Sequence, residues 1–313
     1  MMGRVAKGGE DAAGGREAAL LRRLAGEGDA LLLDGATGTE LERAGLATGL
    51  PLWSSHALLE APEGVGAVHA AHLAAGAEVV TANTFRTQRR TLALAGLGDR
   101  DASLTRLAVS LARHAVDGRT RDDARPAWVA GSLPPLEDCY RPDRVPDDAA
   151  LAREHGRQAE LLGEAGVDLI LVETMNCLRE ALAAATAASR TGLPFVVSFV
   201  AWDGPRLLSG ESLADAARAA MQAGAAAVGV NCLPPENLEA CRVALVATGV
   251  PLVVSPNLGE PDPETGFARD ADRAPAHFVA ALEPWLDRTP RLVGGCCGTT
   301  PAHIRALRAR LGG

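Results

Sequence analysis

The chain has 313 residues, of which 47% are hydrophobic and 22% charged, a composition typical of a globular protein with a substantial buried core and not of a disordered chain. Its 31 Lys and Arg residues and 39 Asp and Glu residues give a net charge of −8 and are mixed along the chain, which argues against a nucleic-acid or anionic-membrane partner. The sole lysine is Lys7, which leaves no P-loop lysine and no buried Schiff-base lysine.

The first 15 residues mix charges with Gly and Ala and contain no apolar core. We therefore expect residues 1–15 to form a flexible tail and not a signal peptide, which predicts a cytoplasmic protein. The longest uncharged stretches, 219–235 and 243–259, are broken by Gly, Pro and polar residues, so we expect no membrane span. No linker divides residues 16–313, which are predicted to form one domain.

Eight short apolar runs follow, each ending in Gly, Asn, Pro or Ser residues before a segment with helical spacing. They cover residues 30–34, 77–82, 127–132, 167–173, 194–201, 225–232, 250–256 and 290–296. These runs are apolar on both faces, as are strands of a buried parallel sheet. The predicted crossover helices include residues 147–165, 178–190, 212–223, 235–248 and 274–286.

Eight βα units in about 280 residues predict an α/β fold that is a single closed (β/α)8 barrel, a fold that typically needs about 250 residues. The alternative is an open doubly wound sheet. In a barrel the active site lies at the carboxyl ends of the strands. The residues at these ends are strongly polar: Asp34, Asn83, Thr84, Ser132, Glu173, Ser198, Asn231, Cys232, Ser255, Asn257, Cys296 and Cys297.

Three of these residues are cysteines, and two of them are adjacent. Cys232 ends the sixth run, and Cys296 and Cys297 end the eighth, among glycines that permit the backbone to break there. Three thiolates leave a tetrahedral zinc ion with one open position, as in a catalytic site. The alternatives are that these cysteines are small buried hydrophobes or that the adjacent pair forms a disulfide. The remaining three, Cys139, Cys177 and Cys241, are expected to be ordinary buried residues.

Four segments resemble the homocysteine S-methyltransferase family: DGATGTELERAG from Asp34, TANTFRTQ from Thr81, VGVNCLPPEN from Val228 and GGCCGTTPAHI from Gly294. The resemblance runs from about Asp34 to the carboxyl terminus. It implies a (β/α)8 barrel in which Cys232, Cys296 and Cys297 hold a catalytic zinc ion.

The family substrate homocysteine carries an ammonium and a carboxylate that must be paired once they leave water. Asp34 and Glu173 are the predicted ammonium acceptors; the alternatives are a helix N-cap for Asp34 and a rim salt bridge for Glu173. Backbone N–H groups of the turn that begins at Gly35 are candidates for the carboxylate. Further candidates for the pocket lining are Asn83, Thr84, Ser198, Asn231 and Asn257, which alternatively bind loop backbone.

Trp53 and Phe85 are candidates for a ring face that contacts a cationic methyl donor, and ordinary packing is the alternative. We expect His69 and His72, spaced i, i+3, to lie on a helix surface and not to form a metal pair.

The predicted function is zinc-dependent transfer of a methyl group from a small donor to the thiol of L-homocysteine. Because only 16 residues follow Cys297, we expect neither the extension of betaine-using members nor a cobalamin module, which leaves S-methylmethionine or S-adenosylmethionine. One alternative is a homocysteine-activating subunit that uses a separate corrinoid methyl carrier. Another is a noncatalytic zinc or thiol barrel that senses redox state. Selenocysteine stays open as an acceptor, and the sequence predicts neither oligomeric state nor regulation.

Overall fold

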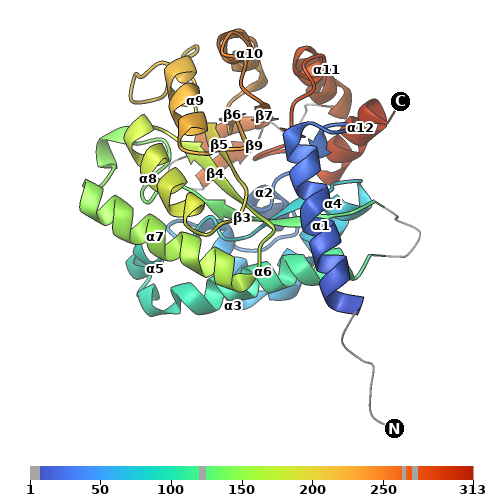
Figure 1. Ribbon diagram of the computed structural model, residues 1–313. Helices are drawn as coiled ribbons and strands as arrows, with labels where there is room; N and C mark the ends of the chain where they lie inside the picture. The colour runs from blue at the N-terminus through green and yellow to red at the C-terminus, as the bar shows by residue number, and fades with distance from the viewer. Residues whose placement is uncertain (1–7, 120–124, 263–265, 270–273, 313) are drawn as a thin grey trace.

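The computed structural model describes residues 8–119, 125–262, 266–269 and 274–312. Its main sheet has eight parallel strands in the order β1-β10-β7-β6-β5-β4-β3-β2 (Figure 1). The strands are β1 (Leu31–Leu32), β2 (Val79–Ala82), β3 (Trp128–Leu133), β4 (Leu169–Met175), β5 (Phe195–Phe199), β6 (Ala227–Asn231), β7 (Leu252–Ser255) and β10 (Leu292–Val293). Each of the eight predicted runs overlaps one of these strands, and only β3 and β4 extend past the end of their runs.

The sheet closes on itself between its first and second strands. Leu33, directly after β1, forms a parallel bridge with Val79 of β2, and the Asp34 N–H donates to the Val79 carbonyl at 2.9 Å. On its other side β1 pairs with β10, where Leu31 lies opposite Leu292. The predicted (β/α)8 barrel is therefore confirmed, and the open doubly wound sheet is wrong.

Burial on both faces explains why the strands appear as continuous apolar runs. In β3, Trp128 and Ala130 pack inside the barrel, whereas Val129 and Leu133 pack against the surrounding helices. All six residues of β3 are buried, as expected for a parallel strand covered on both sides.

The helices lie around the sheet (Figure 1). The longer ones are α1 (Gly8–Ala25), α4 (Pro62–Ala74), α6 (Asp101–Asp117), α7 (Asp148–Ala165), α8 (Leu178–Ser189), α9 (Leu213–Gln222), α10 (Leu238–Val246), α11 (Pro275–Leu286) and α12 (Pro301–Leu311). Shorter helices are α2 (Gly38–Arg43), α3 (His56–Glu60) and α5 (Arg89–Leu94), with 3-10 turns η1 (Trp53–Ser55), η2 (Gly98–Arg100), η3 (Pro142–Arg144) and η4 (Pro235–Asn237). The five predicted crossover helices correspond to α7 through α11.

The sequence analysis predicted neither helix α1 nor the strand pair β8 and β9. Helix α1 begins at Gly8, so residues 8–15 of the expected tail are helical, while residues 1–7 lie outside the described residues. Strands β8 (Gly259–Asp262) and β9 (Gly266–Arg269) form an antiparallel pair after β7. None of the helices in the described part of the chain has the length and apolar character that a bilayer span requires.

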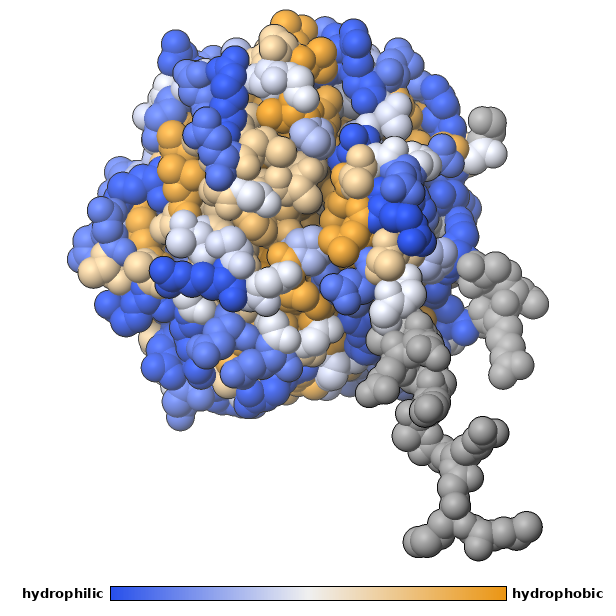
Figure 2. Space-filling view, viewed as in Figure 1, coloured by the Kyte–Doolittle hydropathy of each residue, from blue (hydrophilic) through white to orange (hydrophobic). Residues whose placement is uncertain are grey.

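Helix α1 packs its apolar side against the barrel interior. Leu20 and Leu24 belong to the same buried cluster as Leu31 and Trp128, and Arg23 pairs with Glu78 at 3.1 Å. Figure 1 shows α1 in front of the strands, and Figure 2 shows hydrophobic residues over the middle of that face with hydrophilic residues around them. The helix thus covers part of the barrel end opposite the polar strand ends.

The prediction that His69 and His72 lie on a helix surface is wrong. Both side chains are buried, because α4 contacts α6 and α12 as well as the sheet. His72 Nε2 lies 3.2 Å from the Ala36 carbonyl. Burial lowers the pKa of His69 to about 3 and that of His72 to about 4, so both rings are neutral at pH 7.

Candidate active site

A cavity of about 590 Å³ opens at the carboxyl ends of the barrel strands. Nine of the thirteen candidate site residues line it: Asp34, Gly35, Trp53, Asn83, Phe85, Glu173, Cys232, Cys296 and Cys297. The other four, Thr84, Ser198, Asn231 and Asn257, lie behind its wall and are buried. Residues that closely follow β1, β2, β6 and β10 therefore line one cavity together with Glu173 of β4.

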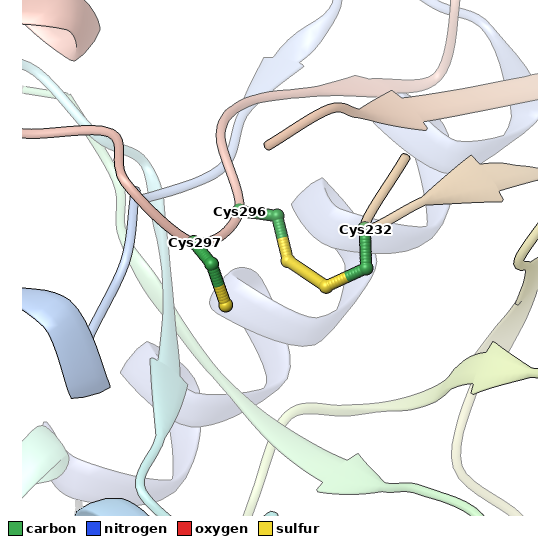
Figure 3. Close-up of side chains that lie close together, drawn as sticks. All are labelled: Cys232, Cys296 and Cys297. Carbon is green, nitrogen blue, oxygen red and sulfur yellow. A yellow bond between two sulfur atoms is a disulfide. The ribbon is translucent and has the colours of Figure 1, made fainter. Parts of the chain in front are cut away.

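The three strand-end cysteines lie together on this wall, with their Sγ atoms all within 4.8 Å of one another (Figure 3). Cys232 and Cys296 are drawn as a disulfide, and the Cys297 thiol is free. The predicted alternative, a disulfide between the adjacent residues Cys296 and Cys297, is therefore not observed. Reduced, the same three sulfur atoms form a group that could hold a metal ion.

The backbone after β10 brings both adjacent cysteines to one side. Gly298 has φ +82°, and a Cβ atom there would lie 1.9 Å from the Leu258 carbonyl oxygen. Only glycine fits such a position. The Leu258 N–H donates to the Cys297 carbonyl at 2.7 Å, which holds the turn against the segment that follows β7.

Asp34 and Glu173 lie on the wall without a cationic partner among the described residues. Asp34 accepts hydrogen bonds from the Thr81 N–H at 2.7 Å and the Thr81 hydroxyl at 2.9 Å. The Ser132 hydroxyl donates to Glu173, and Asn231 Nδ2 donates to the same carboxylate at 3.4 Å. Thr37, not Asp34, is the N-cap residue of α2, so neither predicted alternative role is observed.

Both carboxyl groups are desolvated. Burial, with a smaller contribution from the nearby Glu173 carboxylate, raises the pKa of Asp34 to about 7, although the hydrogen bonds from Thr81 act in the opposite direction. Burial likewise raises the pKa of Glu173 to about 7, although part of its surface is open to the cavity. Two carboxyl groups that lack a cation in a closed space form a site that favours a positively charged ligand group.

Asn231 holds the backbone behind the site. Its Oδ1 atom accepts from the Thr174 N–H at 2.8 Å and from the Ser198 hydroxyl at 2.7 Å, and its Nδ2 atom donates to the Thr174 hydroxyl at 2.9 Å. Thr174 and Cys232, which follow Glu173 and Asn231 in sequence, both have positive φ, at 60° and 52°. These unusual conformations turn the ends of β4 and β6 toward the cavity.

Thr84 and Asn83 also bind neighbouring segments. The Thr84 hydroxyl accepts from the Ser132 N–H at 2.9 Å and donates to the Ser132 carbonyl at 3.0 Å. Asn83 accepts from the Ser54 hydroxyl at 2.6 Å and donates to the Ser54 carbonyl at 2.9 Å. Asn83 therefore ties β2 to the turn that carries Trp53 on the cavity wall.

Gly35, which lines the cavity, lies in the turn after β1. A Cβ atom at Gly35 would lie 2.7 Å from Thr299 Oγ1. The turn after β1 therefore packs closely against the segment after β10, which explains the need for glycine there.

Sequence reasoning missed several wall residues, including Arg86, Cys139 and Tyr140. Cys139 is buried as expected, but it is part of the cavity wall, and burial raises its pKa to about 12. The segment that carries Cys139 and Tyr140 has no periodic pattern that would indicate its position. Arg86 lies in the TANTFRTQ segment next to the candidate Phe85, but no pattern in the sequence indicated that its side chain reaches the cavity.

Comparisons with known proteins agree with the geometry. A family model described as homocysteine S-methyltransferase matches residues 31–311. The homocysteine S-methyltransferase of Escherichia coli K12 is 36% identical over 307 residues, covering 93% of this chain and 98% of that protein. The selenocysteine Se-methyltransferase of Brassica oleracea var. italica is 32% identical over 305 residues, covering 90% and 88% of the two chains.

Solved structures of the Escherichia coli homocysteine methyltransferase MmuM are also similar. The metallated form aligns with a TM-score of 0.81 at 33% identity, covering 93% of this chain and 99% of that chain. The oxidized form gives the same TM-score. The chain therefore belongs to the homocysteine S-methyltransferase family and is a methyltransferase enzyme.

Proposed function

We propose that the protein transfers a methyl group from S-methylmethionine to the thiol of L-homocysteine and forms methionine, with a zinc ion held by Cys232, Cys296 and Cys297. S-Adenosylmethionine is the alternative methyl donor. The observation that carries the proposal is the position of three sulfur atoms within 4.8 Å of one another on the same wall as two carboxyl groups that lack a cation.

The cysteine cluster fits zinc by the chemistry of its ligand atoms. Three thiolates are soft ligands of the kind that zinc prefers, and a tetrahedral ion would keep one position for a substrate sulfur. Bound there, zinc would hold the homocysteine sulfur as a thiolate at neutral pH. The disulfide and the metal site use the same atoms of Cys232 and Cys296, so metal binding requires the reduced protein.

Asp34 and Glu173 supply the ammonium site. Each accepts hydrogen bonds that fix its orientation, from Thr81 and from Ser132 respectively. An ammonium that enters the cavity gains two acceptors and restores the ionised form of both carboxyl groups, because a nearby positive charge lowers a carboxyl pKa. This pairing positions the acceptor with its sulfur free to reach the cysteine cluster.

The rest of the cavity accommodates the methyl donor. Trp53 and Phe85 line the wall, and a sulfonium cation is attracted to an aromatic face. Methyl transfer between two sulfur atoms needs the carbon held in line with both, so most of the chain's contribution is positioning. No side chain has to take a proton from the methyl carbon.

Methionine formation by the reduced, zinc-loaded protein tests the proposal. Homocysteine is offered with S-methylmethionine, S-adenosylmethionine or betaine in parallel, each with a chelated control. Turnover with S-methylmethionine that is lost on chelation supports the proposal. Turnover with S-adenosylmethionine alone contradicts S-methylmethionine as the methyl donor and supports the alternative donor. Absence of turnover with every donor, while homocysteine still binds, contradicts it and favours a separate corrinoid methyl carrier.

The acceptor is tested in the same assay. The Brassica relative is named for selenocysteine, so selenocysteine is compared with homocysteine at equal concentrations. A larger kcat/KM for selenocysteine would contradict homocysteine as the preferred acceptor.

A further inference from the structure

Arg86 is a cation on the cavity wall with no anionic partner among the described residues. Its Nε atom is buried and makes no hydrogen bond there. The guanidinium lies 5.5 Å from the centroid of the Phe85 ring, a contact that orients it. A buried guanidinium donor without an acceptor is unfavourable unless a ligand supplies one.

Two other charged residues of the same wall form ion pairs, whereas Asp138 accepts a hydrogen bond from the Tyr140 N–H at 2.9 Å and Arg144 is exposed to solvent. Glu137 accepts from Arg90 at 2.9 Å, and Arg141 pairs with Asp143 at 2.7 Å. Asp34 and Glu173 hold the hydrogen bonds described above and form no ion pair with Arg86. The cavity therefore contains two carboxyl groups suited to ammonium and, apart from them, a guanidinium suited to an anion.

We propose that Arg86 forms a subsite for the α-carboxylate of the methyl donor, an inference that rests on the proposed function. Methyl transfer between two amino acids brings two carboxylates into one cavity, and a guanidinium binds a carboxylate through two parallel hydrogen bonds. A sulfonium over the Phe85 ring is three carbons from its own carboxylate in S-methylmethionine.

The carboxylate of homocysteine, the methyl acceptor, is the other anion that Arg86 could bind. In homocysteine the ammonium and the carboxylate share one carbon, so a carboxylate stays beside the group that pairs with Asp34 and Glu173. The turn at Gly35 lies next to Asp34 and lines the cavity, which leaves a position for that carboxylate away from Arg86. If Arg86 binds the donor carboxylate, its removal raises KM for S-methylmethionine; if it binds the acceptor carboxylate, its removal raises KM for homocysteine.

The test uses the reduced, zinc-loaded protein and two methyl donors, S-methylmethionine and its methyl ester, which lacks the carboxylate charge. Wild type is expected to prefer the acid over the ester by about 10-fold or more in kcat/KM. Arg86→Gln is expected to raise KM for S-methylmethionine by about 10-fold and to remove this preference. KM for homocysteine should change less than about 2-fold.

Arg86→Lys keeps the charge but not the paired donors, so its KM is expected to lie between those of wild type and Arg86→Gln. Arg89→Gln is the matched control, because Arg89 is exposed, pairs with Asp101 at 3.3 Å and is not part of the cavity wall. It should retain the wild-type preference. Melting temperatures of all variants check that they are folded.

Calorimetry of the acid and the ester with metal-free, reduced protein separates this inference from the proposed function. Tighter binding of the acid that is lost in Arg86→Gln supports the subsite even where no methyl donor turns over. An unchanged preference in Arg86→Gln overturns the subsite, and so does a rise in KM for homocysteine in place of the rise for S-methylmethionine.

Discussion

The sulfur atoms of Cys232, Cys296 and Cys297 are close enough to share one ion. We expect each single Cys→Ser variant to lose most of its zinc and its activity while keeping its far-UV circular dichroism, because a hydroxyl is a much poorer zinc ligand than a thiolate. Zinc per chain is measured by mass spectrometry after reduction. Cys177→Ser is the control, since Cys177 precedes α8 as its N-cap and Ser suits that position. Full zinc occupancy in any of the three variants would refute the ligand set.

Burial disfavours the ionised form of Glu173 and raises its pKa to about 7. The free energy of unfolding therefore depends on pH. The folded protein retains this proton between the unfolded pKa near 4.5 and about 7, so stability falls as pH rises across that interval. Glu173→Gln should therefore melt at a higher temperature than wild type at pH 8 and lose this advantage toward pH 5.5. An equal melting difference at both pH values would contradict the burial effect.

The same substitution should weaken substrate binding. Glu173→Gln is expected to raise KM for homocysteine by about 10-fold or more, because an amide cannot balance the ammonium charge. Zinc content should stay at the wild-type value. Glu137→Gln is a comparison within the same cavity, since Glu137 already pairs with Arg90. Loss of zinc in Glu173→Gln would show that this carboxylate has a different role.

At the level of the elements, Asn231 at the end of β6 joins three strands, because its side chain contacts Thr174 of β4 and Ser198 of β5. Asn231→Ala leaves the buried Thr174 N–H without its acceptor, which costs about 1–3 kcal/mol. Urea unfolding measures this loss, and KM for homocysteine should rise because Glu173 loses a hydrogen bond. Unchanged stability would mean that the contacts of Asn231 are replaced by water.

The elements also show which parts of the structure a sequence can predict. Strands buried on both faces are visible as apolar runs, which is why all eight were found. Strands β1 and β10 are each only two residues long, although the Gly294 and Gly295 N–H groups after β10 still donate to the Val254 and Asp34 carbonyls at 3.1 Å. Helix α1 begins in a Gly-rich stretch with low helix propensity, and its packing against the barrel overrides that propensity.

The sequence also predicted part of the candidate site. Strand ends identify which residues gather at the barrel mouth, so the cysteines and carboxylates were predicted. The sequence does not show whether a polar side chain at an irregular strand end faces the cavity or the neighbouring strands. For this reason the positions of Asn231 and Thr84 behind the cavity wall were not predicted. Cys139 reaches the cavity from a loop without periodicity, where only tertiary packing determines position.

For the whole molecule, α1 is a separate layer on the barrel end away from the site. Leu20 is 1% exposed within the inner cluster, so Leu20→Ala should cost about 2–5 kcal/mol of stability. Both KM values should stay unchanged at temperatures where the variant is folded. Leu21→Ala is the matched control, because the neighbouring Leu21 is 47% exposed. Equal losses in the two variants would contradict the packing of α1.

The pairing of β1 with β10 has a consequence for synthesis on the ribosome. Leu31 gains its partner on this side only after Leu292, in the last strand of the barrel, has been synthesised. Two links near the site have similar spans, from the Ala36 N–H to Thr299 and from the Gly298 N–H to Thr39. A nascent chain therefore carries its first strand with one edge open until the last barrel strand has emerged, and the barrel and its site then close together.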